Sequence, residues 1–142
     1  MTREGALTAS QLGDAAAALA RDLPRGAVVW LQGELGAGKT TFAQAFARGR
    51  GVAVPVTSPT FTLVHRYDGP AGPLYHVDCY RFRAPDEAAD LDWESLTAGD
   101  ALLVEWPERG APWIPHPTVR VLLGHVDDPE RRTVGIMAGA PA

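Results

Sequence analysis

A glycine-rich loop between a strand-like and a helix-like segment limits this chain to a small set of folds. Residues 33–40 read Gly-Glu-Leu-Gly-Ala-Gly-Lys-Thr and match the phosphate-binding pattern G-x-x-x-x-G-K-[ST]. The apolar segment 27–32 before it is typical of a buried strand, and segment 41–48 is typical of a helix that ends at Gly49. In this order several backbone N–H groups can point at one anion, next to the positive end of a helix dipole. The pattern predicts a nucleoside triphosphate site.

The loop contains Lys39, the single lysine of the chain, whereas the other 12 of the 13 basic residues are arginine. An ammonium group is a compact charge on a flexible stem and can follow the β and γ phosphates. The wide planar fork of a guanidinium group does not fit inside a tight loop of backbone amides. We therefore expect Lys39 to contact the phosphates.

The size and composition of the chain indicate one small globular unit. With 142 residues, 46% of them hydrophobic, residues 1–142 are expected to form a single domain with flexible ends at 1–7 and 138–142. The sequence has neither an apolar run of membrane-spanning length nor a secretory signal, so we expect a cytoplasmic protein with no membrane partner. The lone Cys79 is interpreted as a core residue rather than a nucleophile. A net charge of -4 argues against strong unaided binding to nucleic acid.

Hydrophobic periodicity predicts alternating helices and strands. A capping box at Thr8–Gln11 opens a helix that Pro24 to Gly26 ends, and two pairs of strands have the turn signals of antiparallel hairpins. These patterns predict a single-domain α/β P-loop NTPase fold, with a mixed parallel and antiparallel sheet flanked by helices. Further helices are expected at 41–48 and 85–91, and strands at 27–32, 62–67, 74–80, 101–105, 119–123 and 133–136.

Two carboxylates at strand ends are candidates for a magnesium site. Glu105 follows four apolar residues, which is the form of a Walker B element; the alternative is a carboxylate at the rim of the sheet. Asp78 shares a strand face with His76, and its alternative is a structural ion pair with Arg81 or Arg83. His76 itself is more typical of a hydrogen-bonded structural histidine.

Ser58-Pro59-Thr60 follows the predicted P-loop helix. Switch segments at this place carry hydroxyls that approach the γ-phosphate and the metal. A proline-stiffened turn that leads into a strand is an equally good interpretation of the same residues.

Four motifs, taken together, give the chain a family resemblance. In order and spacing they resemble the bacterial TsaE (YjeE) family, over about Leu12 to Ile136. The resemblance implies an ATPase subunit of the machinery that makes N6-threonylcarbamoyladenosine (t6A) in tRNA, acting on the TsaB–TsaD heterodimer and reaching tRNA only through it. The motifs are GELGAGKTTF at 33–42, SPTFTLV at 58–64, YHVDCYR at 75–81 and LVEWP at 103–107.

The resemblance also implies roles for individual residues. Lys39, Asp78 and Glu105 would be catalytic, with Asp78 near the metal to orient its water shell or the attacking water. ATP and Mg²⁺ would be the cofactors, and Thr40 and Glu105 would hold the metal. Trp106 would shape the site, and the base would contact the N-terminal region and either Arg131 or Arg132. The phosphates would lie against Glu34, Leu35, Gly36, Ala37, Gly38, Lys39, Thr40 and Thr41, and Ser58 with Thr60 would form the γ-phosphate switch.

Two other classes of protein share these features. A nucleotide-dependent interaction module with negligible turnover is one, because no residue has the character of a strong water-activating base. A small-molecule P-loop kinase is the other, but it needs an acceptor pocket and an arginine-bearing lid, and no segment here is typical of a helical lid.

Overall fold

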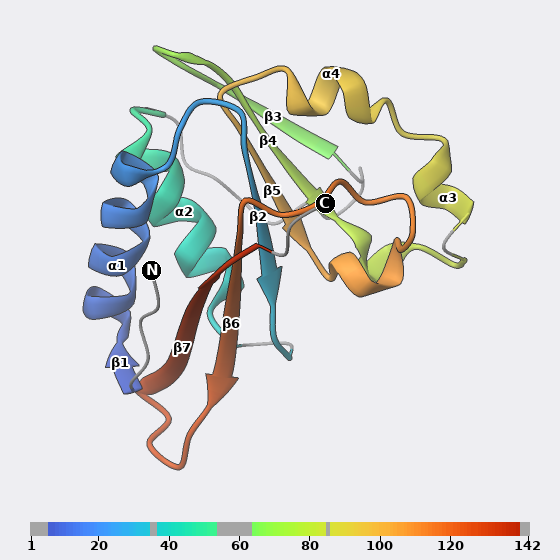
Figure 1. Cartoon of the computed structure of the whole chain (residues 1–142). Helices are drawn as coiled ribbons and strands as arrows, with labels where there is room; N and C mark the ends of the chain where they lie inside the picture. The colour runs from blue at the N-terminus through green and yellow to red at the C-terminus, as the bar shows by residue number, and fades with distance from the viewer. Residues whose placement is uncertain (1–5, 35–36, 54–63, 85, 140–142) are drawn as a thin grey trace.

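The computed structural model describes residues 6–34, 37–53, 64–84 and 86–139. Seven strands form one sheet in the order β1-β7-β6-β2-β5-β4-β3 (Figure 1). The strands are β1 (Ala6–Thr8), β2 (Ala27–Gln32), β3 (Val64–Gly69), β4 (Gly72–Asp78), β5 (Ala101–Glu105), β6 (Val119–His125) and β7 (Arg131–Ala138). The helices are α1 (Ala9–Asp22), α2 (Lys39–Gly49), α3 (Asp86–Ala89) and α4 (Trp93–Thr97), with short 3₁₀ turns η1 (Cys79–Arg81) and η2 (Pro107–Arg109).

The sheet is mixed, as the sequence predicts. Strands β6, β2, β5 and β4 run parallel in its centre, whereas β3 and β7 are antiparallel additions at either side. Parallel strands place their carboxyl ends at one edge, where ligands of open α/β sheets bind. The ends of β2, β4 and β5 therefore lie together at that edge.

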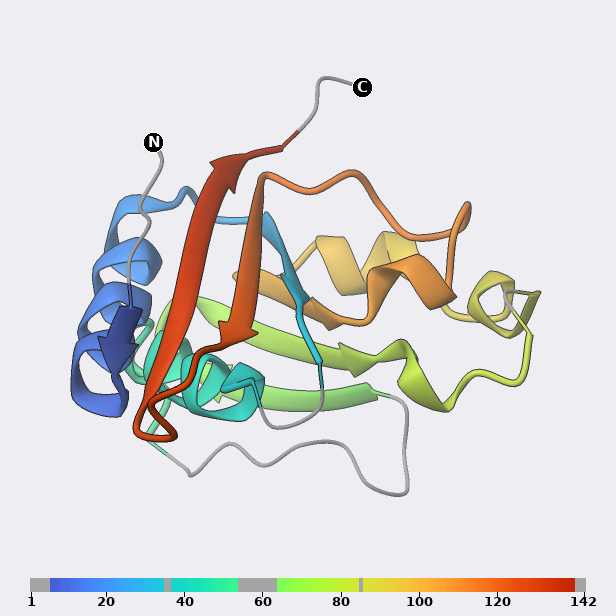
Figure 2. The ribbon, with the colours of Figure 1, turned by 90° about the horizontal axis from the view of Figure 1, so that it is seen from below.

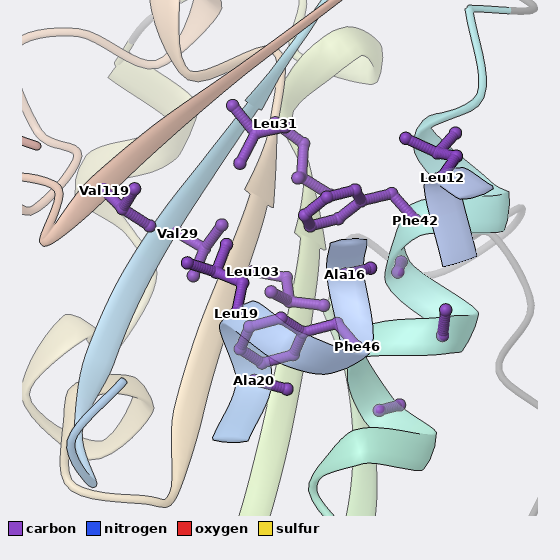
Figure 3. Close-up of a cluster of buried hydrophobic side chains, with 14 of the residues drawn as sticks. Leu12, Ala16, Leu19, Ala20, Val29, Leu31, Phe42, Phe46, Leu103 and Val119 are labelled. Atoms are coloured by element: carbon purple, nitrogen blue, oxygen red, sulfur yellow. The ribbon is translucent and has the colours of Figure 1, made fainter. Parts of the chain in front are cut away.

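Helices α1 and α2 lie side by side on one face of the sheet (Figures 1 and 2). Alanines and glycines allow their close approach: a Cβ at Gly49 would lie 2.9 Å from that of Ala20. Figure 3 shows how Phe42 and Phe46 of α2 pack with leucines of α1 onto the sheet. This cluster fixes α2, and hence the loop before it, relative to the strand ends.

A second cluster fills the opposite face of the sheet, under α3, α4 and the 107–117 segment. Cys79 belongs to this cluster and is fully buried, as expected of a core residue. Its burial raises the pKa of the thiol to about 12, with a smaller contribution from nearby carboxylates. The cluster consists of Val28, Val77, Cys79, Phe82, Ala88, Leu96, Leu102, Val104 and Ile114.

Three of the residues that the sequence assigns to flexible ends pair within the sheet, namely Ala6, Leu7 and Ala138. Ala6 and Leu7 do not belong to a flexible end; they form β1 and pair with β7. Thr8 ends this strand and also caps α1 through the predicted box, in which Gln11 N–H donates to Thr8 Oγ1 at 3.2 Å. At the other end, Ala138 pairs with Val119. Pairing between strands that are distant in the chain, which no local pattern reveals, places these residues in the sheet.

Element boundaries also differ from the expected ones. Strand β3 continues to Gly69 and β4 begins at Gly72, so the turn between them is shorter than the expected turn over residues 68–73. Gly72 allows this tight turn because it adopts a φ of 123°. The chain leaves β4 at Asp78, whose Oδ1 accepts the N–H of Tyr80 at 2.9 Å and starts η1. The sequence patterns do not predict helix α4. Asp92 caps this helix, because its Oδ1 accepts a hydrogen bond from Ser95 N–H at 3.2 Å.

No helix in the described part of the chain is long and apolar enough to cross a membrane.

Candidate nucleotide-binding site

The glycine loop turns from β2 into α2 at the carboxyl edge of the sheet. Gly38 caps α2 in the left-handed region, with a φ of 101°. Gly33 has a φ of 154°, and a Cβ there would lie 2.3 Å from the carbonyl oxygen of Leu123 in β6. Both glycines are therefore required by the path of the backbone. They bring the loop to the N-terminus of α2, where the backbone N–H groups and the positive end of the helix dipole favour an anion.

Lys39 extends back from the first residue of α2 across the loop. Its Nζ donates to the carbonyl oxygens of Gly33, at 2.6 Å, and Glu34, at 2.8 Å. Within the described residues these bonds use two of the three N–H donors of the ammonium and leave one for an anion. Burial lowers the pKa of Lys39, and the carboxylates of Glu105, Asp78 and Glu108 act in the opposite direction. The loop thus fixes a partly desolvated cation at its centre.

Glu105 ends β5 and is buried, only 4% exposed, so the alternative of a rim carboxylate does not describe it. Its Oε2 lies 2.6 Å from Nε2 of His76, which is fully buried. Through backbone pairing Glu105 lies next to Leu31 of β2 and Asp78 of β4. A buried carboxylate beside the loop lysine has the place of a Walker B residue.

Asp78 ends the neighbouring strand β4 and is half-buried. Side chains of β4 alternate between the two faces of the sheet, as expected. Leu74 packs in the cluster on the α2 side, whereas Val77 belongs to the cluster on the opposite face. The Asp78 carboxylate lies near enough to Lys39 to oppose, after Glu105, the lowering of the Lys39 pKa by burial. The structure therefore brings Lys39, Asp78 and Glu105 together at one edge of the sheet, and their catalytic roles stay a prediction.

Trp106 follows Glu105 in the left-handed region, with φ 56° and ψ 48°, which is uncommon for a bulky residue. Its ring lies 4.8 Å from Nζ of Lys39 and 5.0 Å from the ring of Tyr80. Arg109 in turn lies 4.4 Å from the Tyr80 ring. Trp106 and Tyr80 form an aromatic wall at the lysine.

A cavity of about 500 Å³ opens on the other side of the loop, beside the start of α2. Arg132 lines it, and its Nη1 donates to Pro129 O at 2.8 Å. Arg131 instead pairs with Asp128, and it donates to Ala6 O at 3.3 Å. Of the two arginines that the sequence left open, Arg132 is thus the one at the cavity. The other lining residues are Thr8, Ala9, Ser10, Leu12, Gly38, Thr41, Pro129 and Glu130.

Several parts of this arrangement were not apparent from the sequence. The cavity is assembled from α1, the loop and the β6–β7 turn, and the sequence gives no local signal for it. Glu108 also lies near Lys39, and its carboxylate accepts a hydrogen bond from Gln32 Nε2 at 3.4 Å. The sequence feature that could have identified Glu108 is its position three residues after Glu105.

The structure does not describe every residue predicted for the site: Leu35, Gly36, Ser58 and Thr60 lie outside the described residues. Glu34, Ala37, Gly38, Lys39, Thr40 and Thr41 all lie at the loop or the start of α2.

The donor groups fit a triphosphate and a hard divalent cation. The N-terminus of α2 and Lys39 supply N–H donors and positive charge for phosphate oxygens. Thr40 and Glu105 supply the hydroxyl and the carboxylate that typically hold Mg²⁺ in a P-loop site. The carboxylate is already held at one oxygen by His76.

Known proteins with the same sequence pattern and fold exist. Residues 7–134 match the family described as "Threonylcarbamoyl adenosine biosynthesis protein TsaE". Relatives named tRNA threonylcarbamoyladenosine biosynthesis protein TsaE come from Nostoc (39% identity), Bacillus subtilis (40%) and Treponema pallidum (40%). These matches cover 80%, 75% and 78% of this chain and 72%, 66% and 82% of the relatives, respectively.

The fold also resembles the crystal structure of Bacillus subtilis YdiB. The TM-score is 0.73 at 28% identity, over 98% of this chain and 88% of YdiB. The similarity in sequence therefore extends to the whole described architecture. This chain belongs to the TsaE family of tRNA threonylcarbamoyladenosine biosynthesis proteins.

Proposed function

We propose that this protein binds and hydrolyses ATP with Mg²⁺ and acts on the TsaB–TsaD heterodimer during t6A modification of tRNA. The observation that carries the proposal is the position of Lys39. Its ammonium is held across the glycine loop by two carbonyls and lies near the buried carboxylate of Glu105. This pairing of a cation for phosphate with a carboxylate for metal supports a nucleotide-hydrolysing site rather than a simple anion site.

In this proposal each part of the loop edge has a role. Lys39 and the backbone of Glu34 to Thr41 hold the β and γ phosphates. Thr40 and Glu105 hold magnesium, which when bound neutralises the charge on the phosphate oxygens. Asp78 orients water at the metal, and the aromatic wall limits the approach of bulk solvent. The adenine base occupies the cavity lined by Arg132, where a planar guanidinium can stack on it.

The proposed partner follows from the family and from the charge of the chain. A net charge of -4 favours tRNA contact through another protein over direct binding. The Ser58–Thr60 segment, outside the described residues, is proposed as the γ-phosphate switch. ATP should then strengthen docking onto TsaB–TsaD relative to ADP, since only a difference in affinity between the two states can drive such a change. The cytoplasm is the proposed location, where tRNA is modified.

ATP turnover with and without purified TsaB–TsaD tests the proposal. We expect weak turnover alone and faster turnover with the heterodimer. Lys39→Ala should weaken ATP binding tenfold or more, which is about 1.4 kcal/mol. Arg66→Ala is a matched control, because Arg66 is an exposed arginine of β3 that pairs with Asp68 and also interacts with Tyr75, outside the proposed site.

Glu105→Ala separates binding from hydrolysis. It should reduce turnover far more than the affinity for ATP measured without Mg²⁺, because the loop and Lys39 still hold the phosphates. ATP binding without turnover under any condition would favour a nucleotide-dependent interaction module. Tight ATP binding by Lys39→Ala would contradict the proposed site itself.

A further inference from the structure

His76 on β4 makes a short, buried side-chain contact in the site. Its Nε2 lies 2.6 Å from Oε2 of Glu105, and the two side chains are 0% and 5% exposed. We infer that His76 is a positioning residue that fixes the Glu105 carboxylate in the orientation needed to hold magnesium. The inference rests on the proposed function and adds to it a residue that acts through Glu105.

Strand geometry explains why histidine reaches Glu105. In the parallel pairing of β4 and β5, His76 is opposite Leu103, and Asp78 is opposite Glu105. His76 and Leu103 are thus each two residues before the end of their strand, on the same face as the carboxylates that follow them. The imidazole of His76 therefore lies two residues before the end of β5, within hydrogen-bonding distance of the Glu105 side chain.

One oxygen of Glu105 is thereby committed, and no described residue forms a hydrogen bond to the other, which is available to a ligand. A glutamate side chain has several rotamers, and a hydrogen bond to Oε2 removes most of that freedom. Hydrogen-bonded outer partners of this kind orient metal ligands in proteins, and their removal typically costs about 10- to 100-fold in metal affinity.

The surroundings of the imidazole indicate which nitrogen carries the hydrogen. A carboxylate accepts, so Nε2 is assigned as the N–H donor. Nδ1 of His76 is buried and has no hydrogen-bond partner among the described residues. An unpaired acceptor is tolerated in a buried place more readily than an unpaired N–H donor. Within the described part of the chain, the polar contact of the ring is therefore the one with Glu105.

The other buried ionic pair of the described residues shows what a purely structural contact looks like. Arg50 donates to Asp100 at 3.2 Å and also to the carbonyls of Leu23 and Pro24. That group joins the end of α2 to loops at the edge of the sheet remote from the phosphate loop. His76 has no such role in joining loops, since it lies within β4 and contacts the end of the adjacent strand.

The test compares the affinity of the whole protein for ADP with Mg²⁺ and with EDTA, by calorimetric titration. The ratio of the two affinities measures the contribution of the metal. His76→Leu removes the donor at similar volume and should lower this ratio about tenfold or more, with metal-free affinity unchanged. His76→Gln places an amide nitrogen near the position of Nε2 and should restore most of the ratio. His116→Leu, at an exposed histidine, should behave as the wild type.

Each outcome bears on a separate claim. A wild-type protein that binds no ADP, or binds it equally with and without Mg²⁺, would overturn the proposed function. A wild-type dependence on Mg²⁺ that His76→Leu retains in full would overturn only the positioning role. If His76→Leu fails to fold by circular dichroism, His76→Gln is compared with His76→Asn, whose amide lies near Nδ1 instead. Equal ratios for Gln and Asn would then overturn the inference.

Discussion

The ammonium of Lys39 lies 4.8 Å from the centroid of the Trp106 ring. The ring reaches this place because Trp106 adopts a left-handed conformation immediately after Glu105, with its N–H donating to Leu31 O at 3.3 Å. The same turn of the backbone ends β5 at its carboxylate and places an aromatic face at the lysine. Strained backbone of this kind persists where the surroundings hold it, and it is concentrated at functional sites.

Two substitutions of Trp106 separate its ring from its backbone. Trp106→Ala and Trp106→Gly both remove the cation–π contact and should weaken ATP binding about threefold, corresponding to roughly 0.5–1 kcal/mol. The glycine variant should have the higher free energy of unfolding, by about 0.5–1 kcal/mol, because alanine is strained in the left-handed region. Urea denaturation measures the difference. Equal free energies of unfolding for the two variants would show that residue 106 does not keep its left-handed conformation in solution.

A pair of glycine substitutions tests the path of the loop. Gly33→Ala places a Cβ 2.3 Å from Leu123 O, so β6 or the loop has to move. We expect a loss of more than about 2 kcal/mol in the free energy of unfolding, together with loss of ATP binding. Gly135→Ala is the control, because a Cβ there meets nothing within 4 Å. A stable Gly33→Ala variant that still binds ATP would contradict this loop geometry.

The two neighbouring arginines of β7 should differ in nucleotide binding. Arg132→Ala should weaken ATP binding about tenfold, because Arg132 lines the cavity proposed for the base. Arg131→Ala should have little effect, since that side chain is turned to Asp128 and Ala6. Inorganic tripolyphosphate, which has no base, should bind both variants as it binds the wild type. Equal effects of the two substitutions on ATP would place the base elsewhere.

Cys79 provides a pH-dependent prediction. Burial raises its pKa to about 12 from 9.0, so the folded protein should react with a thiol reagent at pH 8 at least a thousandfold more slowly than the unfolded chain. Between pH 9 and 12 the unfolded chain loses this proton while the folded chain keeps it. The free energy of unfolding should therefore fall as the pH rises through that range. Cys79→Ala, measured alongside, should show a smaller fall, and rapid labelling of the native protein would contradict the buried assignment.

The sequence by itself determined the elements that form the phosphate end of the site. The order strand, glycine loop and helix requires few distant contacts, because Gly38, Lys39 and the capping of α2 are set by neighbouring residues. The two-residue period of β4 likewise places His76 and Asp78 on one face. Local patterns of this kind therefore gave the fold class and the catalytic candidates.

Only the tertiary structure decided how these pieces meet. The position of β5 between β2 and β4 brings Glu105 beside Lys39, and no local pattern specifies that strand order. The pairing of β1 with β7 places Thr8 and Arg132 in the lining of the cavity beside the loop. The contact between His76 and Glu105 joins two strands 29 residues apart. Contacts of this kind depend on packing and pairing between segments distant in the chain, which is why the sequence left the choice between Arg131 and Arg132 open.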